Sequence, residues 1–188
     1  MLACRGDFAS ADEHIRKAQS LDPLSLIIRT NIGWLHYFQK NYANAEEAYQ
    51  EVLKIDPGVL PARQKLWITY AVEEKTEQAA AELENLMRLF GHQNLLHKAE
   101  SAKPANRYQV DVQTYVESGT LSRHEKARYL ALLGRKPEAV HALGETAAQR
   151  SPWMVCLRIE PVFDQANLPE LPKAVGESRG GIAAAAVG

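Results

Sequence analysis

The chain has 188 residues, of which 46% are apolar and 24% are charged, and this composition fits one ordinary domain or a short array of repeats. Its formal net charge is −1, which gives no electrostatic reason to expect nucleic acid or an anionic membrane as a partner. No apolar run approaches the roughly 18 residues that a membrane-spanning helix needs, so we expect no contact with a membrane.

The chain has two cysteines, Cys4 and Cys156, which lie far apart in the sequence. Two thiols do not make the disulfide framework that is typical of small secreted domains. The sequence therefore predicts a reduced, cytoplasmic protein.

A period of 34 residues organises the first half of the chain, because Asp22-Pro23 and Asp56-Pro57 are 34 positions apart. The residues before each dipeptide match at identical offsets. The matched pairs are Leu21 and Ile55, Ala18 and Val52, Ile15 and Tyr49, Ala11 and Ala45, and Phe8 and Tyr42. Small and aromatic residues at fixed offsets in a 34-residue period are typical of a helix–turn–helix solenoid.

Apolar residues at three- and four-residue steps predict a series of helices in this half, beginning with Phe8, Ala11 and Ile15. Each Asp-Pro pair ends a helix, because the residue before proline is pushed out of helical geometry. The expected helices span 8–21, 24–39, 42–55, 59–73 and 76–90. One more period from Pro57 reaches Gly91, which is also a helix stop.

The period fails over 92–121, where we expect a loop at 103–106 and a helix at 108–117. It returns at Ser122, which forms a capping box with Glu125 and begins a helix over 122–133. A partner helix over 137–149 completes a degenerate repeat. The apolar stretch 151–157 is expected to form a capping turn or helix, and the Pro-, Gly- and Ala-rich tail 166–188 is expected to be disordered.

The segment Asn31-Ile32-Gly33-Trp34-Leu35-His36-Tyr37, followed by Tyr42, Ala45, Tyr49 and Pro57, resembles a tetratricopeptide repeat. A second copy is suggested by Trp67, Tyr70, Ala79 and Leu83. The resemblance implies an all-α, right-handed solenoid of three to four helix pairs over 1–165. Its repeats would span about 1–23 (partial), 24–57, 58–91 and 122–152 (degenerate), with Gly33 and Ala45 at a close helix crossing.

In this family the first helix of each pair lines a concave groove that binds proteins or peptides. The resemblance places Ile27, Thr30, Asn31, Trp34, Tyr37, Phe38, Gln64, Lys65, Ile68 and Ala71 in that groove. Asn31 would hold a peptide backbone and Lys65 a carboxylate, although the family's full carboxylate clamp is not present. The alternative for Trp34 and Phe38 is that both pack against neighbouring helices.

Residues 150–164 are similar to the closing motif of helical repeat regions in bacterial signalling proteins, where such a region follows a winged-helix, nucleotide cyclase or protein kinase domain. The resemblance implies the sensing or docking part of a signalling or transcription-regulating protein. The alternative is a structural scaffold or complex subunit that self-associates through the open N-terminal end of the solenoid.

No pattern for catalysis, a cofactor or a metal is found in the sequence. His92 and His97 are five residues apart, without the short ligand spacing of a zinc site. Glu46-Glu47 and Glu73-Glu74 are adjacent carboxylates, which point apart on a helix and suit an outer face better than an acid–base pair. We therefore expect a binding protein that is not an enzyme.

Overall fold

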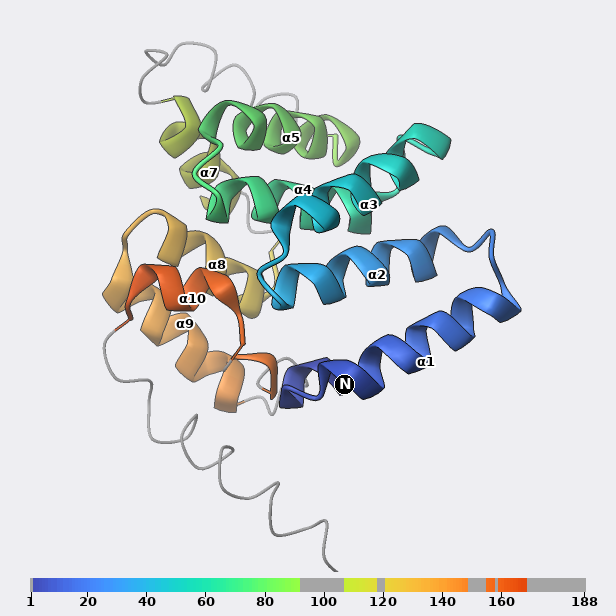
Figure 1. The fold of residues 1–188 in the computed structure, drawn as a ribbon. Coiled ribbons are helices and arrows are strands. Elements are labelled where there is room, and N and C mark those ends of the chain that lie inside the picture. The colour runs from blue at the N-terminus through green and yellow to red at the C-terminus, as the bar shows by residue number, and fades with distance from the viewer. Residues whose placement is uncertain (1, 92–106, 118–120, 149–154, 158, 169–188) are drawn as a thin grey trace, which may run out of the picture.

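The computed structural model describes residues 2–91, 107–117, 121–148, 155–157 and 159–168, and within these ranges every regular element is a helix (Figure 1). This confirms the predicted all-α fold. The elements are η1 (Ala3–Arg5), α1 (Phe8–Leu21), α2 (Leu26–Phe38), α3 (Tyr42–Ile55), α4 (Leu60–Val72), α5 (Thr76–Leu89), α7 (Arg107–Glu117), α8 (Arg123–Leu132), α9 (Lys136–Ala148) and α10 (Pro161–Ala166).

Local signals set the helix ends. The backbone N–H of Ile28 donates to the Ser25 hydroxyl, so α2 begins at Leu26, two residues later than predicted. At α8, Ser122 and Glu125 form the predicted capping box, with each side chain accepting a bond from the other residue's backbone N–H. The predicted bounds of α1 and α3 are confirmed, because the aspartate of each Asp-Pro pair is the C-cap.

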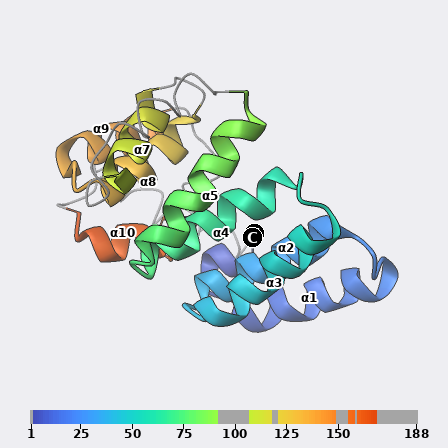
Figure 2. The same ribbon diagram turned by 90° about the horizontal axis from the view of Figure 1, so that it is seen from above.

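Helices that follow one another in the chain pack together from α1 through α5, α7 packs more closely against α5 than against α8, and α8 packs against α9. Seen from above, α1–α3, α4–α5 and α7–α9 follow one another across the molecule (Figure 2). The closest pairs are α2 with α3, α4 with α5, and α8 with α9. Nearest-neighbour packing of helix pairs is the architecture of a tetratricopeptide-like solenoid.

The crossing of α2 and α3 depends on a small residue. A Cβ added to Gly33 would lie 2.5 Å from Cε1 of Tyr49, a distance that no side chain tolerates. Ala45, on the other helix of the pair, is completely buried. These contacts confirm the predicted close crossing and fix the register of the repeat.

Aromatic rings join the degenerate repeat to the regular ones. Trp67 of α4 is completely buried, and its ring meets the edge of Tyr129 of α8 at 4.4 Å between centroids. Tyr115 of α7 lies 5.6 Å from Tyr129. The repeats therefore share one continuous core although the sequence period fails between them.

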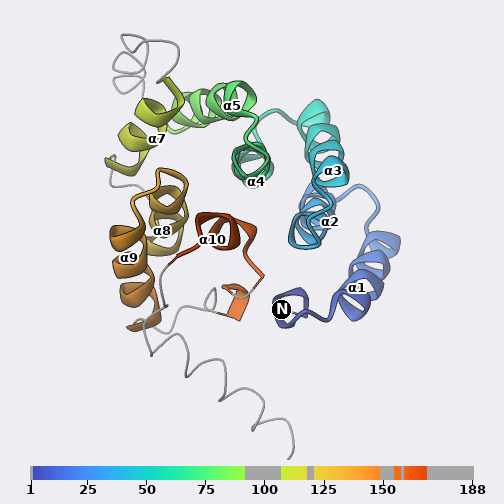
Figure 3. The same ribbon diagram turned by 60° about the vertical axis from the view of Figure 1, so that its left-hand side comes forward.

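The sequence did not predict α10, and it departs from the nearest-neighbour rule. It packs against α8 and α4 and lies inside the arc of the other helices (Figure 3). Glu160, Val162 and Phe163 are buried there. We call residues 155–157 and 159–168 the groove segment.

Cys4 of η1 and Cys156 of the groove segment are joined by a disulfide. The prediction of two separate thiols is therefore wrong in this structure. The two cysteines are 152 residues apart in the sequence, so their proximity could not be predicted from it. The arc of helices brings the two segments together (Figure 3).

Several predictions lie outside the described residues. These are the loop at 103–106, the positions of His92 and His97, most of the apolar stretch 151–157, and the tail from residue 169 onward. The described part of that stretch, 155–157, forms a turn. The predicted helix at 108–117 is confirmed as α7.

The packing at the α2–α3 crossing leads to a prediction about stability. Ala45→Leu adds three carbons where the structure has no space, and we expect it to lower the free energy of unfolding by roughly 1–3 kcal/mol. Glu47→Leu, on the exposed face of α3, is the control and should change it by less than about 0.5 kcal/mol. Chemical denaturation measures both, and equal losses would contradict the register.

Candidate functional site

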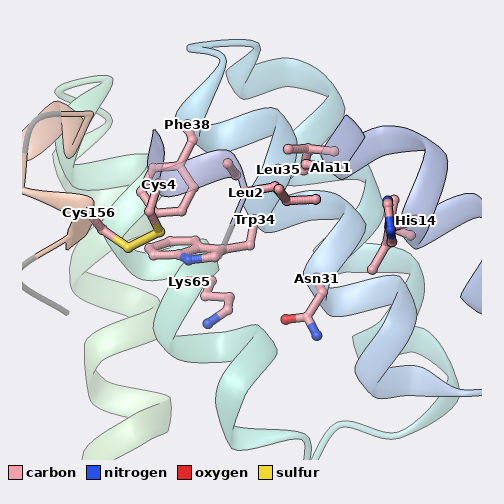
Figure 4. A pocket seen from close by; sticks show the side chains of 12 residues that line it. Leu2, Cys4, Ala11, His14, Asn31, Trp34, Leu35, Phe38, Lys65 and Cys156 are labelled. Carbon is pink, nitrogen blue, oxygen red and sulfur yellow. A yellow bond between two sulfur atoms is a disulfide. The ribbon is translucent and has the colours of Figure 1, made fainter. Parts of the chain in front are cut away.

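A cavity of about 440 Å³ lies at the N-terminal end of the concave face (Figure 4). Its walls come from η1, α1, α2, α4 and the groove segment, and they are mostly apolar. Among the residues that the structure describes, no aspartate or glutamate lines it. The lining residues are Leu2, Ala3, Cys4, Ala11, His14, Ile15, Asn31, Trp34, Leu35, Phe38, Lys65 and Cys156.

Trp34 is the main aromatic wall of this cavity. Its ring stacks on Tyr37 at 4.5 Å between centroids, with only 2° between the planes. The edge of Phe38 lies 4.8 Å away. Because these neighbours hold the ring in place, Trp34 both packs within the fold and presents a preorganised apolar surface to the cavity.

Lys65 of α4 places its Nζ 4.4 Å from the centre of the Trp34 ring, a cation–π contact. Burial, followed by the charge of Arg128, lowers the pKa of Lys65 to about 8, although Glu160 acts in the opposite direction. In the part of the chain that the structure describes, no ion pair within 4.0 Å includes Lys65. The cavity therefore contains a largely buried cation without a paired carboxylate.

Asn31 lies one helical turn before Trp34 on α2, and its side chain is exposed beside the cavity. An amide carries two donors and an acceptor, which suits it to hold the backbone of an extended peptide. His14 of α1 lines the same cavity from the opposite helix. The structure thus brings four predicted groove residues together: Asn31, Trp34, Phe38 and Lys65.

Other predicted groove residues are covered. The Tyr37 hydroxyl donates to Oε1 of Glu160 at 2.5 Å, beneath the groove segment. Thr30 is buried, with its hydroxyl bonded to the carbonyl of Leu26 at 2.7 Å. Ile68 and Ala71 of α4 are also buried. These side chains cannot touch a partner while the groove segment and its neighbours hold this arrangement.

The two remaining predicted residues lie apart from the cavity. Ile27 is 56% exposed in the first turn of α2. Gln64 is partly buried and hydrogen-bonds to Tyr115. The structure therefore divides the predicted groove into a cavity, a covered centre and outlying positions.

Glu160 anchors the groove segment. Its carboxylate is almost fully buried and accepts the bond from Tyr37, and Nη1 of Arg128 lies 3.6 Å from its Oε2. Burial raises the pKa of Glu160, while Arg128 and Tyr37 lower it. A second ion pair, between Lys40 and Asp164 at 3.0 Å, is exposed on both sides. The buried pair connects α2, α8 and the groove segment.

Sequence reasoning missed the groove segment, Glu160 and Arg128. Glu160 lies inside the recognised 150–164 motif, but nothing in that motif indicates Tyr37 or Arg128 as its contacts. The disulfide had one available signal, because Cys4 and Cys156 are the only two cysteines in the chain. Their pairing needed the tertiary structure to bring them together.

Within the described ranges, no group of three or more histidine, cysteine, aspartate or glutamate side chains is placed to hold a metal ion. The helices in those ranges are also too short or too polar to cross a lipid bilayer.

Comparison with known proteins identifies the class of the repeat. The model of the tetratricopeptide repeat matches residues 27–59, which contain all of α2 except its first residue, and all of α3. With the successive helix pairs, this match supports a tetratricopeptide-repeat protein, a class that generally mediates protein–protein interaction.

A protein O-mannosyl-transferase of Caenorhabditis elegans is 33% identical over 64 residues, which are 34% of this chain and 9% of that protein. The chain thus spans under a tenth of the length of this curated relative. No solved structure matches the chain.

The buried cation leads to a pH-dependent prediction. The pKa of Lys65 falls from 10.5 to about 8 on folding, so its charged form destabilises the fold at pH 7, and this cost fades as the pH rises from about 8 toward 10.5. Lys65→Met keeps the apolar stem without the charge. We expect it to raise the free energy of unfolding by roughly 1–3 kcal/mol at pH 7 and by clearly less at pH 10.

Urea denaturation at the two pH values measures this difference. Lys54→Met, at an exposed position of α3, is the matched control and should show no such pH dependence. Equal stabilisation by Lys65→Met at both pH values would contradict the assignment of a costly buried charge.

Proposed function

We propose that this chain is a protein-interaction module that binds an extended peptide at the cavity around Trp34. The observation that carries the proposal is the convergence of Asn31, Trp34 and Lys65 on one cavity. A partly buried ammonium group such as that of Lys65, with no ion pair to any described residue, does not stabilise the fold. Such perturbed groups cluster at functional sites, and a ligand carboxylate would offset the cost of burying this one.

The chemistry of the cavity defines the partner peptide. Trp34, Leu35 and Phe38 offer apolar contact to one side chain, and the Asn31 amide offers hydrogen bonds to the backbone. Lys65, in a cavity whose described lining residues include no aspartate or glutamate, favours a carboxylate close to that apolar side chain. The partner would therefore carry an apolar residue next to an acidic residue or to its own C-terminus.

We place the module in a bacterial signalling or transcription-regulating protein, as its sensing or docking part in the cytoplasm. The support for this setting is the similarity of residues 150–164 to the closing motif of such helical regions. In this proposal the module acts by binding and performs no reaction of its own. Any output would come from a partner or from another domain.

Binding by the cavity is tested with two substitutions. We expect Trp34→Ala to lower the affinity for a captured partner by about thirtyfold, because losing an aromatic anchor typically costs 2 kcal/mol or more of binding free energy. Asn31→Ala should have a smaller effect and cost about 0.5–1.5 kcal/mol of binding free energy, which is the contribution of one hydrogen bond. Calorimetric titration with the partner, found by pull-down and then purified, measures both effects.

Glu47→Ala on the exposed face of α3 is the control, and circular dichroism shows whether each variant is folded. If folded Trp34→Ala and Asn31→Ala bind normally while Glu47→Ala abolishes binding, the partner uses the outer face and the proposal is wrong.

A second candidate function is a self-associating scaffold, and one feature of the structure favours it. Leu21 and Leu24, at the turn between α1 and α2, are 79% and 82% exposed. No residue of α1 is fully buried. An apolar end of this kind could pack against the end of another copy.

The scaffold function predicts a concentration-dependent mass. Light scattering over a hundredfold range of protein concentration should show growth beyond the monomer, and Leu24→Asp should suppress it by placing a charge in the contact. Glu13→Asp, at an exposed position of α1, is the control. A constant monomer mass would exclude the scaffold and leave the peptide-binding proposal intact.

A further inference from the structure

The groove segment follows a path that a simple end cap would not take. A capping helix of a solenoid covers the outer face of the last repeat. Here α10 packs against α8 and α4 inside the arc, and Glu160 reaches Tyr37 on α2 (Figure 3). The segment therefore occupies the concave surface on which partners of such arrays dock.

The groove segment contacts the other helices through a paired, buried carboxylate and an apolar helix face, as a bound peptide would. A buried carboxylate is costly unless it is paired and hydrogen-bonded, and Glu160 receives the Tyr37 hydroxyl on one oxygen and Arg128 on the other. The ring of Phe163 lies 6.2 Å from that of His124, with the planes nearly perpendicular. An acidic residue followed by an apolar helix face thus fills the centre of the groove.

A covalent bond holds the beginning of this segment. Cys156 is joined to Cys4, and both cysteines line the Trp34 cavity (Figure 4). Cys4 belongs to η1, a helix of three residues in which no residue is fully buried. Ala3 and Cys4 are only partly buried against the core, so the disulfide adds a covalent restraint to both η1 and the start of the groove segment.

We propose that the groove segment is an internal occupant of the concave face and that the Cys4–Cys156 bond is a redox latch that keeps it there. A dithiol reductant opens the latch by giving two electrons and two protons to the bond. Two cysteine thiols form, and the reductant becomes its own disulfide. The segment is then held by non-covalent contacts alone, and the occupied state becomes less populated.

The latch deepens the proposed function, because the face that it closes includes Tyr37 and adjoins the cavity where the partner would bind. It also fits the proposed cytoplasmic setting, since disulfides in that compartment are usually transient and redox-sensing. A partner of the same chemistry, acidic and then apolar, would compete with the segment once the latch is open.

Hydrogen exchange of the full chain tests the latch without any partner. On reduction with dithiothreitol, we expect amide exchange in η1 and α10 to accelerate at least tenfold, while exchange in α4 and α5 stays unchanged. Cys4→Ser without reductant should reproduce the reduced pattern. Equal exchange of α10 in the oxidised and reduced protein, or equal acceleration in all helices, would overturn the latch.

A matched pair of variants tests the internal occupant. In the reduced protein, Glu160→Gln removes the buried charge and should accelerate exchange in α10 by at least a further tenfold. Asp164→Asn removes the exposed ion pair with Lys40 and should change the exchange rate of α10 by less than threefold. Equal effects of the two variants would show that Glu160 is not the anchor.

The two proposals fail in distinguishable ways. If Trp34→Ala leaves the affinity for the partner unchanged but reduction still accelerates exchange in α10, the proposed binding site is wrong and the latch is supported. If Trp34→Ala weakens the partner but α10 exchanges equally in both redox states, the latch is wrong and the binding site stands.

Discussion

The buried carboxylate of Glu160 connects parts of the molecule that the repeat pattern leaves unconnected. Its contacts with Tyr37 and Arg128 join α2, near the start of the array, to α8 and α10, near its end. Neither contact follows from stacking, because in a solenoid each repeat touches mainly its neighbours. A charge in this position is tolerated only because both of its oxygens have partners, so the path of the groove segment depends on the Tyr37 and Arg128 side chains.

This anchor also shapes the candidate site. With the centre of the concave face closed over Tyr37, the cavity lies at the N-terminal end, among η1, α1, α2, α4 and the groove segment. Trp34 then has one face on Tyr37 and another toward the cavity, so the packing and binding interpretations of this residue are compatible. Lys65 is brought over the same ring and retains a charge that its surroundings do not neutralise.

The sequence predicted the helices well because their signals are local. Asp-Pro stops, the Ser122 capping box and the small residues Gly33 and Ala45 at a helix crossing each involve one helix or two adjacent helices. The predicted groove was less accurate in detail, since family positions state which helix face points inward but not what covers that face. Tyr37 and Ile68 do face inward, and the chain's own residues cover them.

By itself, the sequence determined the class of fold, the repeat register and most helix bounds, because a 34-residue period encodes contacts between neighbouring helices. Only the tertiary structure decided that Cys4 meets Cys156, that Glu160 reaches Tyr37, and that a cavity remains beside Trp34. The disulfide and the Glu160–Tyr37 hydrogen bond join residues 152 and 123 positions apart, and the cavity includes Cys156 beside residues 2–65, so none of these features follows the period. They depend on the curvature of the whole array, which is the sum of many small helix crossings that no single motif specifies.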